Sequence, residues 1–273
     1  MSLAMAAPSG VRHAALAGST PALQARDITL TFGGVTALQD VSLEVGADEL
    51  VALIGPNGAG KSSLLNVLSG FYRPRRGSIA FQGQDIGGWP VHRIAAAGLA
   101  RTFQGTHLLA HMSVLDNILV GRYCHMKTGL AAAFAYYPFA HREEVEHRAK
   151  AEAIIRFLEI EHVRHQPVGT LGYGMRKRVD LGRALAMEPR VLLLDEPMAG
   201  MNGEEKEDLA RFILDVRESR HIPVVLVEHD MGVVMDIADR VVVLNFGRKI
   251  AEGTPAAVQA DPAVISAYLG KST

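Results

Sequence analysis

The sequence feature that most limits the fold is a glycine-rich loop that lies between a short apolar run and a helical pattern. The run Leu50–Ile54 is continuously apolar, as expected of a strand buried on both faces of a parallel sheet. After the loop, Leu64, Leu65 and Leu68 recur at helical spacing. The loop comprises Gly55, Pro56, Asn57, Gly58, Ala59, Gly60, Lys61 and Ser62, with Ser63 next. This strand–loop–helix unit predicts an α/β fold of the P-loop NTPase (RecA-like) class.

The loop has the composition of a phosphate-binding site. Glycines allow several backbone N–H groups to face one anion without a Cβ in the way, and the helix start adds partial positive charge. We expect Lys61 to reach the β- and γ-phosphates of ATP and the hydroxyl of Ser62 to hold Mg²⁺. The alternative is a glycine-rich turn with an exposed lysine, which the flanking strand and helix disfavour.

Two carboxylates follow a second apolar run, residues 191–194. Asp195 and Glu196 stand directly after it, and ligands of open α/β sheets bind at the carboxyl ends of strands. We therefore expect Asp195 to approach Mg²⁺ through a water molecule, and Glu196 to act as general base on the attacking water. The alternative is a pair of solvated acids at a strand end, which the upstream phosphate loop disfavours.

The remaining patterns predict how the chain is organised. Residues 26–45 alternate around a turn at Gly33 and Gly34, which predicts an N-terminal antiparallel β subdomain. Residues 76–84 read as another edge hairpin strand and residues 91–100 as a short helix. Residues 114–168 read as helical, with breaks at Gly129 and Pro138. Strand-like runs return at residues 191–194, 224–227 and 241–244 with helical patterns between them, which predicts a mostly parallel sheet core.

These patterns set the expected domain boundaries. Residues 1–24 are rich in Ala, Gly and Ser and are predicted to be a disordered tail. Residues 25–273 form one ATPase domain, with an α-helical subdomain inserted at about residues 105–185 and a C-terminal extension at about residues 250–273.

Charge and hydropathy exclude several classes of protein. Lys and Arg total 28 against 29 Asp and Glu, so no basic excess indicates a nucleic-acid partner. The single cysteine excludes a disulfide framework within the chain. No apolar run approaches the roughly 18 residues needed to span a bilayer. We therefore expect a chain that is soluble by itself and is carried to any membrane by a partner.

Four further segments resemble motifs of the ATP-binding proteins of ABC transporters. Residues 170–178 resemble the signature motif, and Gln104, within residues 101–105, resembles the Q-loop glutamine. His229, within residues 227–231, resembles the switch histidine, and residues 199–202 resemble the D-loop. The order and spacing of these motifs agree with the family, and the resemblance extends from about Leu23 to the end of the chain.

The resemblance implies a head-to-tail pair of cassettes that encloses two ATP molecules. Gln104 and His229 join Glu196 in hydrolysis, Gln104 also contacts Mg²⁺, and Phe32 stacks on adenine. The residues that meet the ATP held by the other cassette are Leu171, Gly172, Tyr173, Gly174, Met175 and Asn202. The alternatives are structural: Phe32 packs under its hairpin, His229 is a hydrogen-bonded residue at a strand end, and Gln104 is a surface residue.

The signature departs from the usual sequence of the family, Leu-Ser-Gly-Gly-Gln. Gly172 replaces the serine, and Met175 replaces the glutamine. Loss of the hydroxyl removes one donor to the γ-phosphate, worth roughly 1–3 kcal/mol if the site is dry. Because backbone donors and the helix end remain, we expect a functional but weaker closing contact.

Several segments resemble one subfamily, the ATP-binding proteins of branched-chain amino acid transporters. They are residues 32–38, 69–74, 101–104, 227–231 and 267–270, and an additional stretch at about residues 121–142. The resemblance implies an importer subunit at the cytoplasmic face of the bacterial inner membrane. Its partners are two permease subunits, a second ATPase subunit as homo- or heterodimer and, indirectly, a solute-binding protein.

The cargo and the docking surface are open at this stage. Urea and short amides are alternative solutes. Apolar candidates for the permease groove near Gln104 are Leu108, Leu109, Met112 and Val114, with ordinary helical core as the alternative. A non-transport ABC protein would need tandem cassettes, long coiled coils or zinc cysteines, none of which the sequence contains. The altered signature leaves a regulatory subunit with little hydrolysis as another alternative.

Overall fold

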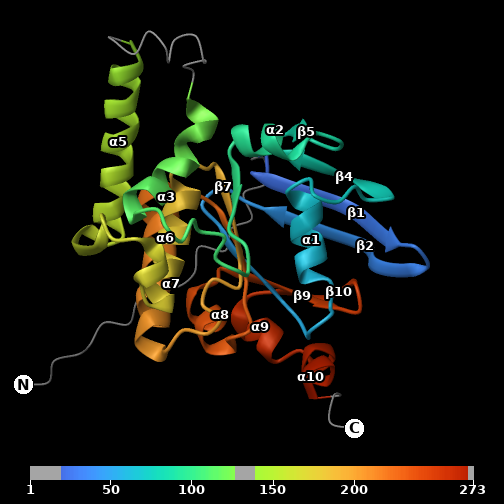
Figure 1. The fold of residues 1–273 in the computed structure, drawn as a ribbon. Coiled ribbons are helices and arrows are strands. Elements are labelled where there is room, and N and C mark those ends of the chain that lie inside the picture. Colours follow the sequence, from blue (N-terminus) through green and yellow to red (C-terminus); the bar gives the residue numbers. More distant parts are fainter. Residues whose placement is uncertain (1–19, 127–138, 270–273) are drawn as a thin grey trace, which may run out of the picture.

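The computed structural model describes residues 20–126 and 139–269 and arranges them as two sheets flanked by helices (Figure 1). The central sheet has six strands in the order β10-β9-β3-β8-β7-β6. Its neighbouring pairs are parallel except β9 and β10, which are antiparallel. The strands are β3 (Leu50–Ile54), β6 (Leu99–Arg101), β7 (Val191–Asp195), β8 (Val224–Val227), β9 (Arg240–Asn245) and β10 (Arg248–Gly253). The predicted α/β class with a mostly parallel core is confirmed.

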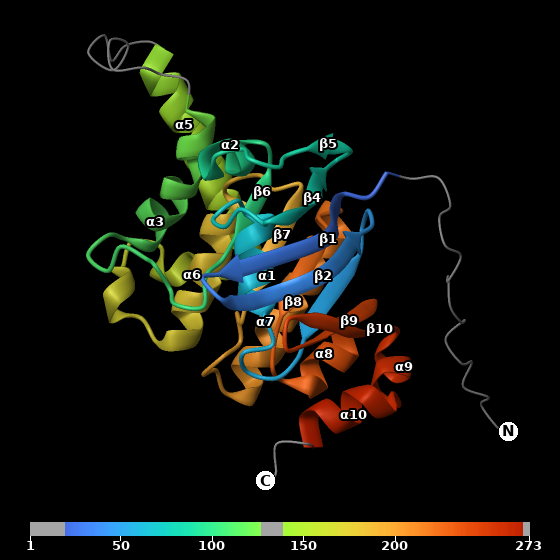
Figure 2. The ribbon, with the colours of Figure 1, turned by 90° about the vertical axis from the view of Figure 1, so that its right-hand side faces the viewer.

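Burial explains why three of these strands were recognisable as unbroken apolar runs. Every residue of β3, β7 and β8 is buried, because helices or the second sheet cover both faces of the central sheet. Figure 2 shows the antiparallel sheet lying beside α1 on one side of the central strands.

The edge strand β6 corrects the prediction of one helix over residues 91–100. The helix α2 (Val91–Ala96) ends early, because Gly98 adopts a φ of 108°, a conformation outside the helical region. Leu99–Arg101 then pairs in parallel with β7, and the N–H of Arg190 donates to the carbonyl of Gly98 at 2.7 Å. Pairing with a buried strand overrides the helical propensity of the alanines.

The second sheet is antiparallel and has the order β2-β1-β4-β5. It comprises β1 (Leu23–Phe32), β2 (Val35–Val45), β4 (Arg76–Phe81) and β5 (Gln84–Asp85). The predicted hairpin at Gly33 and Gly34 is confirmed. The hairpin predicted at residues 76–84 is confirmed by the antiparallel pairing of β4 with β5. Its placement at the edge of the sheet is wrong for β4, which pairs with β1 on its other side.

The predicted tail and the predicted helical region both extend into residues outside the described part of the chain. β1 begins at Leu23, two residues before the boundary predicted for the tail, because its first residues pair with both β2 and β4. Residues 1–19 lie outside the described part. The breaks predicted at Gly129 and Pro138, and most of the additional stretch at residues 121–142, also lie outside it.

Helices cover the central sheet and build a separate helical region beside it. The helical region contains α3 (Val114–Val120), the 3-10 helices η1 (Gly121–His125), η2 (Glu161–Val163) and η3 (Val168–Thr170), α5 (Phe139–Phe157) and α6 (Tyr173–Leu185). The other helices are α1 (Lys61–Leu68), α7 (Gly203–Arg220), α8 (Met231–Ile237), α9 (Pro255–Gln259) and α10 (Pro262–Leu269). One apolar cluster joins α3, α5 and α6 to α7 and to one face of the sheet.

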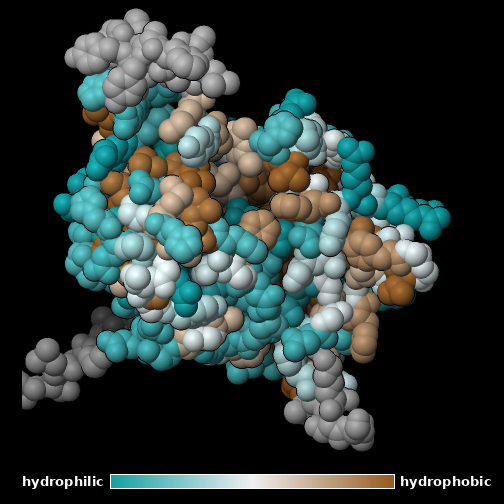
Figure 3. All heavy atoms as spheres, in the orientation of Figure 1, coloured by the Kyte–Doolittle hydropathy of each residue, from teal (hydrophilic) through white to brown (hydrophobic). Residues whose placement is uncertain are grey.

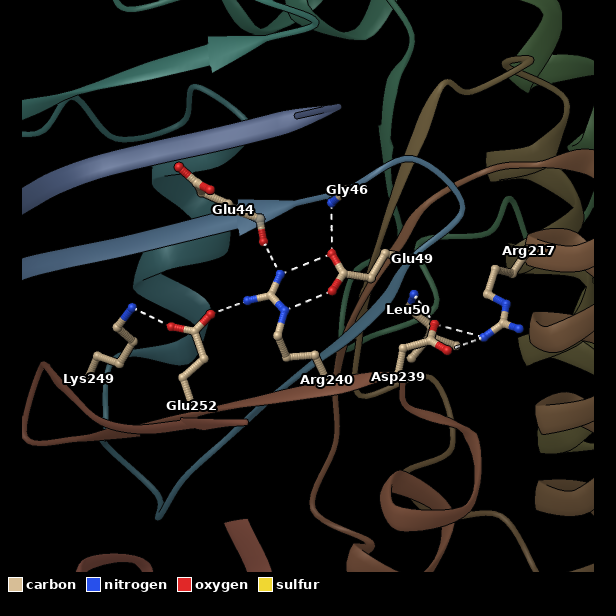
Figure 4. Close-up of polar contacts among 9 residues, drawn as sticks. All are labelled: Glu44, Gly46, Glu49, Leu50, Arg217, Asp239, Arg240, Lys249 and Glu252. Carbon is tan, nitrogen blue, oxygen red and sulfur yellow. Dashed lines mark hydrogen bonds and ion pairs between the residues drawn. The ribbon is translucent and has the colours of Figure 1, made fainter. Parts of the chain in front are cut away.

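An ionic network around Arg240 ties the two sheets together (Figure 4). The guanidinium of Arg240 on β9 donates to both carboxylate oxygens of Glu49, at 2.7 and 3.0 Å, and to the backbone carbonyl of Glu44 on β2 at 2.6 Å. It also pairs with Glu252 on β10. The network therefore connects the end of the antiparallel sheet to β9, to β10 and to the residue just before β3.

The network predicts a stability that depends on pH. Burial disfavours the carboxylate of Glu252, but Lys249 and Arg240 outweigh burial and lower its pKa below 4.5. A carboxyl with a lower pKa in the folded state stabilises the protein above its unfolded pKa, and this contribution is lost as the pH falls through the folded pKa. Glu252→Gln is expected to lower the free energy of unfolding by about 1 kcal/mol near pH 7 and by almost nothing near pH 3.

Thermal unfolding of both proteins across this pH range measures the effect. Glu218→Gln is the matched control, because Glu218 is exposed and, within the described part of the chain, its ion pair is with its neighbour Arg217 at 3.1 Å. A difference between wild type and Glu252→Gln that stays constant down to about pH 3 would contradict the assignment.

Candidate active site

A cleft of about 980 Å³ lies where the carboxyl ends of β3, β6, β7 and β8 meet. The phosphate loop forms one wall, and Gln104, Glu196 and His229 reach the cleft from the strand ends opposite. The loop residues that line it are Asn57, Gly58, Ala59, Gly60, Lys61, Ser62 and Ser63. The structure thus gathers in one cleft most of the residues predicted to act within a single cassette.

Two glycines explain why the loop has its sequence. Gly55 has a φ of 147°, and a Cβ there would overlap the carbonyl oxygen of Leu244 on β9. Gly60 has a φ of 103°, and a Cβ there would lie 2.9 Å from a methyl group of Leu38 and 3.0 Å from the carbonyl oxygen of Ala37. The tight packing of the loop on β9 and β2 requires glycine at both positions.

Lys61 belongs to the loop, begins α1 and is buried. Its Nζ donates to the carbonyl oxygens of Gly55 at 2.7 Å and Pro56 at 3.1 Å. The ammonium is therefore held over the loop beside the N-terminus of α1, where helix and lysine both favour an anion.

The three residues predicted to act in hydrolysis are in contact. Nε2 of Gln104 donates to Oε2 of Glu196 at 2.8 Å, and Nε2 of His229 contacts Oε1 of the same carboxylate. Glu196 has a φ of 49°, in the left-handed region that costs energy for a residue with a side chain. Its N–H donates to the carbonyl of Val227 at 2.9 Å. The carboxylate is thus fixed between Gln104 and His229, in a position to accept a proton from water.

Asp195 ends β7 and is almost completely buried. One of its carboxylate oxygens accepts from Nη2 of Arg101 at 2.9 Å, with both side chains 6% exposed. The other, Oδ1, is buried and has no hydrogen-bond partner in the described part of the chain. A buried carboxylate oxygen without a partner is costly, and oxygen ligands of this kind suit Mg²⁺. Asp195, the hydroxyl of Ser62 and the amide of Gln104 supply oxygen atoms of the kind that suits a hydrated magnesium ion; Ser62 and Gln104 line the cleft, whereas Asp195 does not.

Arg101 is a site residue that sequence reasoning missed. It was only part of the segment around Gln104. Its Nη1 also donates to Oδ1 of Asn66 at 2.7 Å and to Oγ of Ser69 at 3.0 Å, so it joins α1 to the end of β7. The sequence indicated that Asp195, at the end of a buried strand, requires a cationic partner, but it did not indicate which basic residue is that partner.

Glu228, which precedes the switch histidine, was also missed. It is buried, and its carboxylate accepts from the N–H of Met198 at 2.7 Å and of His229 at 3.1 Å. Burial raises its pKa, against the effect of these two hydrogen bonds. Glu228 therefore links the end of β8 to the turn that follows Glu196.

The residues predicted to contact a second cassette do not line this cleft. Gly172 is the N-cap residue of α6 and is exposed. Tyr173 is 38% exposed, with its ring beside Gly200. Asn202 caps α7, where its side chain accepts from the N–H of Glu205 at 2.9 Å. The structure gives Tyr173 and Asn202 packing and capping roles and leaves their contact with a second ATP a prediction.

Phe32 also lies outside the set of residues that line the cleft. It is 45% exposed at the end of β1, with its ring edge-on to Tyr72 at a centroid distance of 5.0 Å. Val35 and Thr36, just after the hairpin turn, do line the cleft. The adenine contact of Phe32 remains a prediction.

The fold and the site together define an ATP-binding cassette, a P-loop ATPase with a helical signature region. Comparisons with known proteins agree: the family model described as ABC transporter matches residues 38–199, and the model described as branched-chain amino acid ATP-binding cassette transporter matches residues 248–272. The chain belongs to the ATP-binding proteins of the ABC transporter family, within the branched-chain amino acid transport subfamily. ATP-binding proteins of this family are ATPases that dimerise and work with membrane permeases at the membrane periphery.

Individual relatives match nearly the whole chain. The high-affinity branched-chain amino acid transport ATP-binding protein BraF of Pseudomonas aeruginosa is 39% identical over 93% of this chain and 100% of its own length. The corresponding protein LivG of Escherichia coli K12 is 39% identical with the same coverage. A nucleotide-free cassette from an ABC transporter superposes with a TM-score of 0.81 at 32% identity, covering 92% of this chain and 100% of that one.

Within residues 20–126 and 139–269, no helix combines the length and the apolar character needed to cross a membrane.

Proposed function

We propose that this chain is the ATP-hydrolysing subunit of an importer for branched-chain amino acids. The observation that carries the cargo assignment is the match of residues 248–272 to the C-terminal model of that subfamily. In the structure, Val264 of α10 and Val258 of α9 share an apolar cluster with Ile54, the residue just before the phosphate loop. The C-terminal extension therefore packs on the nucleotide-binding core.

The geometry of the cleft supports the proposed hydrolytic roles. Lys61 and the loop N–H groups bind the phosphates, and Ser62, Gln104 and Asp195 would hold Mg²⁺, which would neutralise phosphate charge. Glu196 orients and deprotonates the attacking water. His229, beside Glu196, contacts the γ-phosphate.

The paired arrangement explains why the signature residues lie outside the cleft of their own chain. Gly172 is exposed, and a Cβ there would meet nothing within 4 Å. The N-terminus of the 13-residue helix α6 is thus open to an anion from another molecule. We infer that Leu171, Gly172, Tyr173, Gly174, Met175 and Asn202 meet the ATP of a second ATPase subunit, identical or different.

A second cleft supports a docking site for a permease. It has a volume of about 540 Å³ and lies between the segment before Gln104 and the helical region. Figure 3 shows apolar side chains gathered over α3 and the surface between it and α2. The residues that line the cleft are Phe71, Arg101, Phe103, His107, Val120, Gly121, Cys124, Asp180, Arg183, Ala184 and Met187.

The residues predicted for this groove divide into two groups. Val114 is fully buried in the helical core, and Leu108 packs partly buried against the same cluster, so the groove assignment of Val114 is wrong. The reason is that Val114 begins α3 and faces inward, toward α5 and α6. Leu109 and Met112 are 47% and 37% exposed but do not line this cleft, so their contact with a permease remains a prediction.

The groove assignment predicts the effect of a charge in its apolar wall. Phe71 is 49% exposed and contacts Phe103 edge-on at 5.8 Å. Phe71→Asp is expected to reduce co-purification with the permease subunits at least about tenfold, because an unpaired carboxylate would be desolvated by the docked helix.

Tyr123→Asp provides the matched control, since Tyr123 is 68% exposed and does not line the groove. Thermal unfolding checks that both variants remain folded. Equal recovery of the permease with Phe71→Asp and wild type would exclude this groove as the docking site.

The proposed complex also fixes location and indirect partners. Two permease subunits bring the chain to the cytoplasmic face of the bacterial inner membrane. A solute-binding protein delivers cargo to the permeases without contacting this subunit. The balance of 28 basic and 29 acidic residues supports the absence of a nucleic-acid partner.

The cargo is tested with the co-purified and reconstituted complex. ATP hydrolysis is measured with the solute-binding protein and leucine, isoleucine or valine, and in parallel with urea or a short amide. Stimulation by the branched-chain amino acids is expected. Stimulation by urea or amides alone would assign the subunit to a related importer.

A further inference from the structure

Lys177 is a buried cation that none of the roles described so far uses. It lies in the second turn of α6 and is 3% exposed. Its Nζ donates to the carbonyl oxygen of Gln104 at 3.0 Å and to that of Glu196 at 3.3 Å. It also lies 5.6 Å from the ring centroid of Tyr173. A buried ammonium is unfavourable unless such groups compensate it, so its position is specific.

The two carbonyl groups belong to the two residues whose side chains meet in the cleft. Lys177 contacts the backbones of Gln104 and Glu196, while their side chains are joined by the 2.8 Å hydrogen bond. The three residues form a closed arrangement in which one cation sets the distance between the Q-loop and the catalytic turn. Displacement of either backbone would break a hydrogen bond of the buried ammonium.

The turn that Lys177 contacts is strained. Glu196 holds a φ of 49°, which persists only when surrounding contacts enforce it. The carbonyl of Glu196 accepts a hydrogen bond from Nζ of Lys177. Two residues later, the N–H of Met198 donates to the buried carboxylate of Glu228. A buried cation and a buried anion thus hold the turn at both ends.

The helix that carries Lys177, α6, also packs on residues that follow this turn in the sequence. At its start, Gly174 packs on the side chain of Glu205, and the ring of Tyr173 lies beside Gly200. A displacement of α6 would therefore be transmitted to residues 196–205 through packing as well as through the ammonium.

We propose that Lys177 is a positioning residue: from the signature helix, it holds the backbones of Glu196 and Gln104 in the geometry required for hydrolysis. This inference rests on the proposed function, in which Glu196 is the general base and α6 meets the ATP of a second subunit. Closing one ATP site on α6 then acts, through Lys177, on the hydrolytic residues of the other site.

Three substitutions test the proposal in the full-length chain within the co-purified transporter. Lys177→Met keeps the length and apolar stem of the side chain and removes its donors. We expect kcat for ATP to fall about tenfold or more, because small displacements of reacting groups are costly, and KM to change less than about threefold. Lys177→Arg, which retains a charged donor, should recover most of kcat. Lys150→Met is the matched control, because Lys150 is 40% exposed and pairs with Glu146 and Glu188 far from the cleft.

The results separate positioning from folding. A kcat of Lys177→Met within about twofold of wild type would overturn the proposal. So would a Lys177→Arg protein as inactive as Lys177→Met, or a rise in KM with kcat unchanged. If Lys177→Met does not fold, as judged by its unfolding midpoint, Lys177→Gln replaces it, because its shorter, uncharged side chain is not expected to reach both carbonyls; a kcat within about twofold of wild type would again overturn the proposal.

The proposed function fails by a different result. If Glu196→Gln hydrolyses ATP at the wild-type rate in the same complex, then Glu196 is not the base, whatever Lys177 does. If Glu196→Gln is inactive and Lys177→Met is fully active, only the role of Lys177 is excluded.

Discussion

Lys61→Ala is expected to weaken MgATP binding by about a hundredfold or more, because a charge-assisted contact to phosphate contributes about 1.5–3 kcal/mol and Lys61 is expected to make more than one. The structure supports a large effect. The ammonium is buried and is held by the carbonyls of Gly55 and Pro56. Because residues 55–63 contain no second Lys or Arg, no neighbour in the loop supplies the same charge. Removing it also frees those two carbonyls, which then repel the phosphates.

Titration of the full-length chain with a fluorescent ATP analogue and Mg²⁺ measures this affinity. Lys150→Ala, on the exposed face of α5, controls for the loss of one positive charge from the molecule. Thermal unfolding without nucleotide shows whether the loop substitution destabilises the fold. Unaltered affinity for the nucleotide in a folded Lys61→Ala protein would contradict the assignment of residues 55–63 as the phosphate-binding loop.

The parts of the site that could be predicted are those that local sequence determines. The loop, the strand before it and the helix after it are contiguous, and their glycines are required by backbone geometry at Gly55 and Gly60. Asp195 and Glu196 were found for the same reason, because they follow a buried strand. Such elements carry their own signal in composition and spacing.

The parts that could not be predicted depend on contacts across long stretches of chain. Arg101 meets Asp195 across 94 residues, and Lys177 meets Gln104 across 73. Nothing in the local pattern marks either cation as buried: Lys177 stands between two further basic residues, Arg176 and Arg178, that are only partly buried. β6 was mistaken for helix for the same reason, because its three residues are a strand only beside β7.

The altered signature has a smaller structural effect than the lost hydroxyl suggested. Gly172 caps α6 with extended backbone and no side-chain hydrogen bond, and glycine costs only a few tenths of a kcal/mol at such a position. Met175 packs partly buried against the helical core instead of facing the cleft. The helix start remains intact, so the departure leaves the fold of the motif unchanged and bears on the contact predicted with a second ATP.

Glu196→Gln is expected to lower kcat about a thousandfold, the size of effect typical of losing a general base, while ATP binding is retained. Glutamine has the shape of glutamate and can still accept from Gln104, which donates to Glu196 at 2.8 Å, but it cannot accept a proton from water. The strained backbone, with φ at 49°, is kept because its carbonyl contact with Lys177 does not involve the side chain.

Steady-state ATPase activity of the transporter complex measures the effect. Glu204→Gln is the matched control, since Glu204 is an exposed residue in the first turn of α7. Unchanged turnover in Glu196→Gln would exclude Glu196 as the base. If wild type itself turns over at the low rate of Glu196→Gln, the alternative of a regulatory subunit with little hydrolysis is favoured.

The same variant tests the paired arrangement, because a cassette that binds ATP without hydrolysing it should remain closed on its partner. With ATP and Mg²⁺, size-exclusion chromatography of Glu196→Gln is expected to show a dimer that wild type forms only transiently. A second substitution, Lys61→Ala, should abolish this dimer, since the phosphates that bridge the phosphate loop of one chain and Gly172–Gly174 of the other are then not held. A Glu196→Gln chain that stays monomeric alone but dimerises with a second cassette protein identifies a heterodimer. Failure to dimerise under both conditions would count against the sandwich.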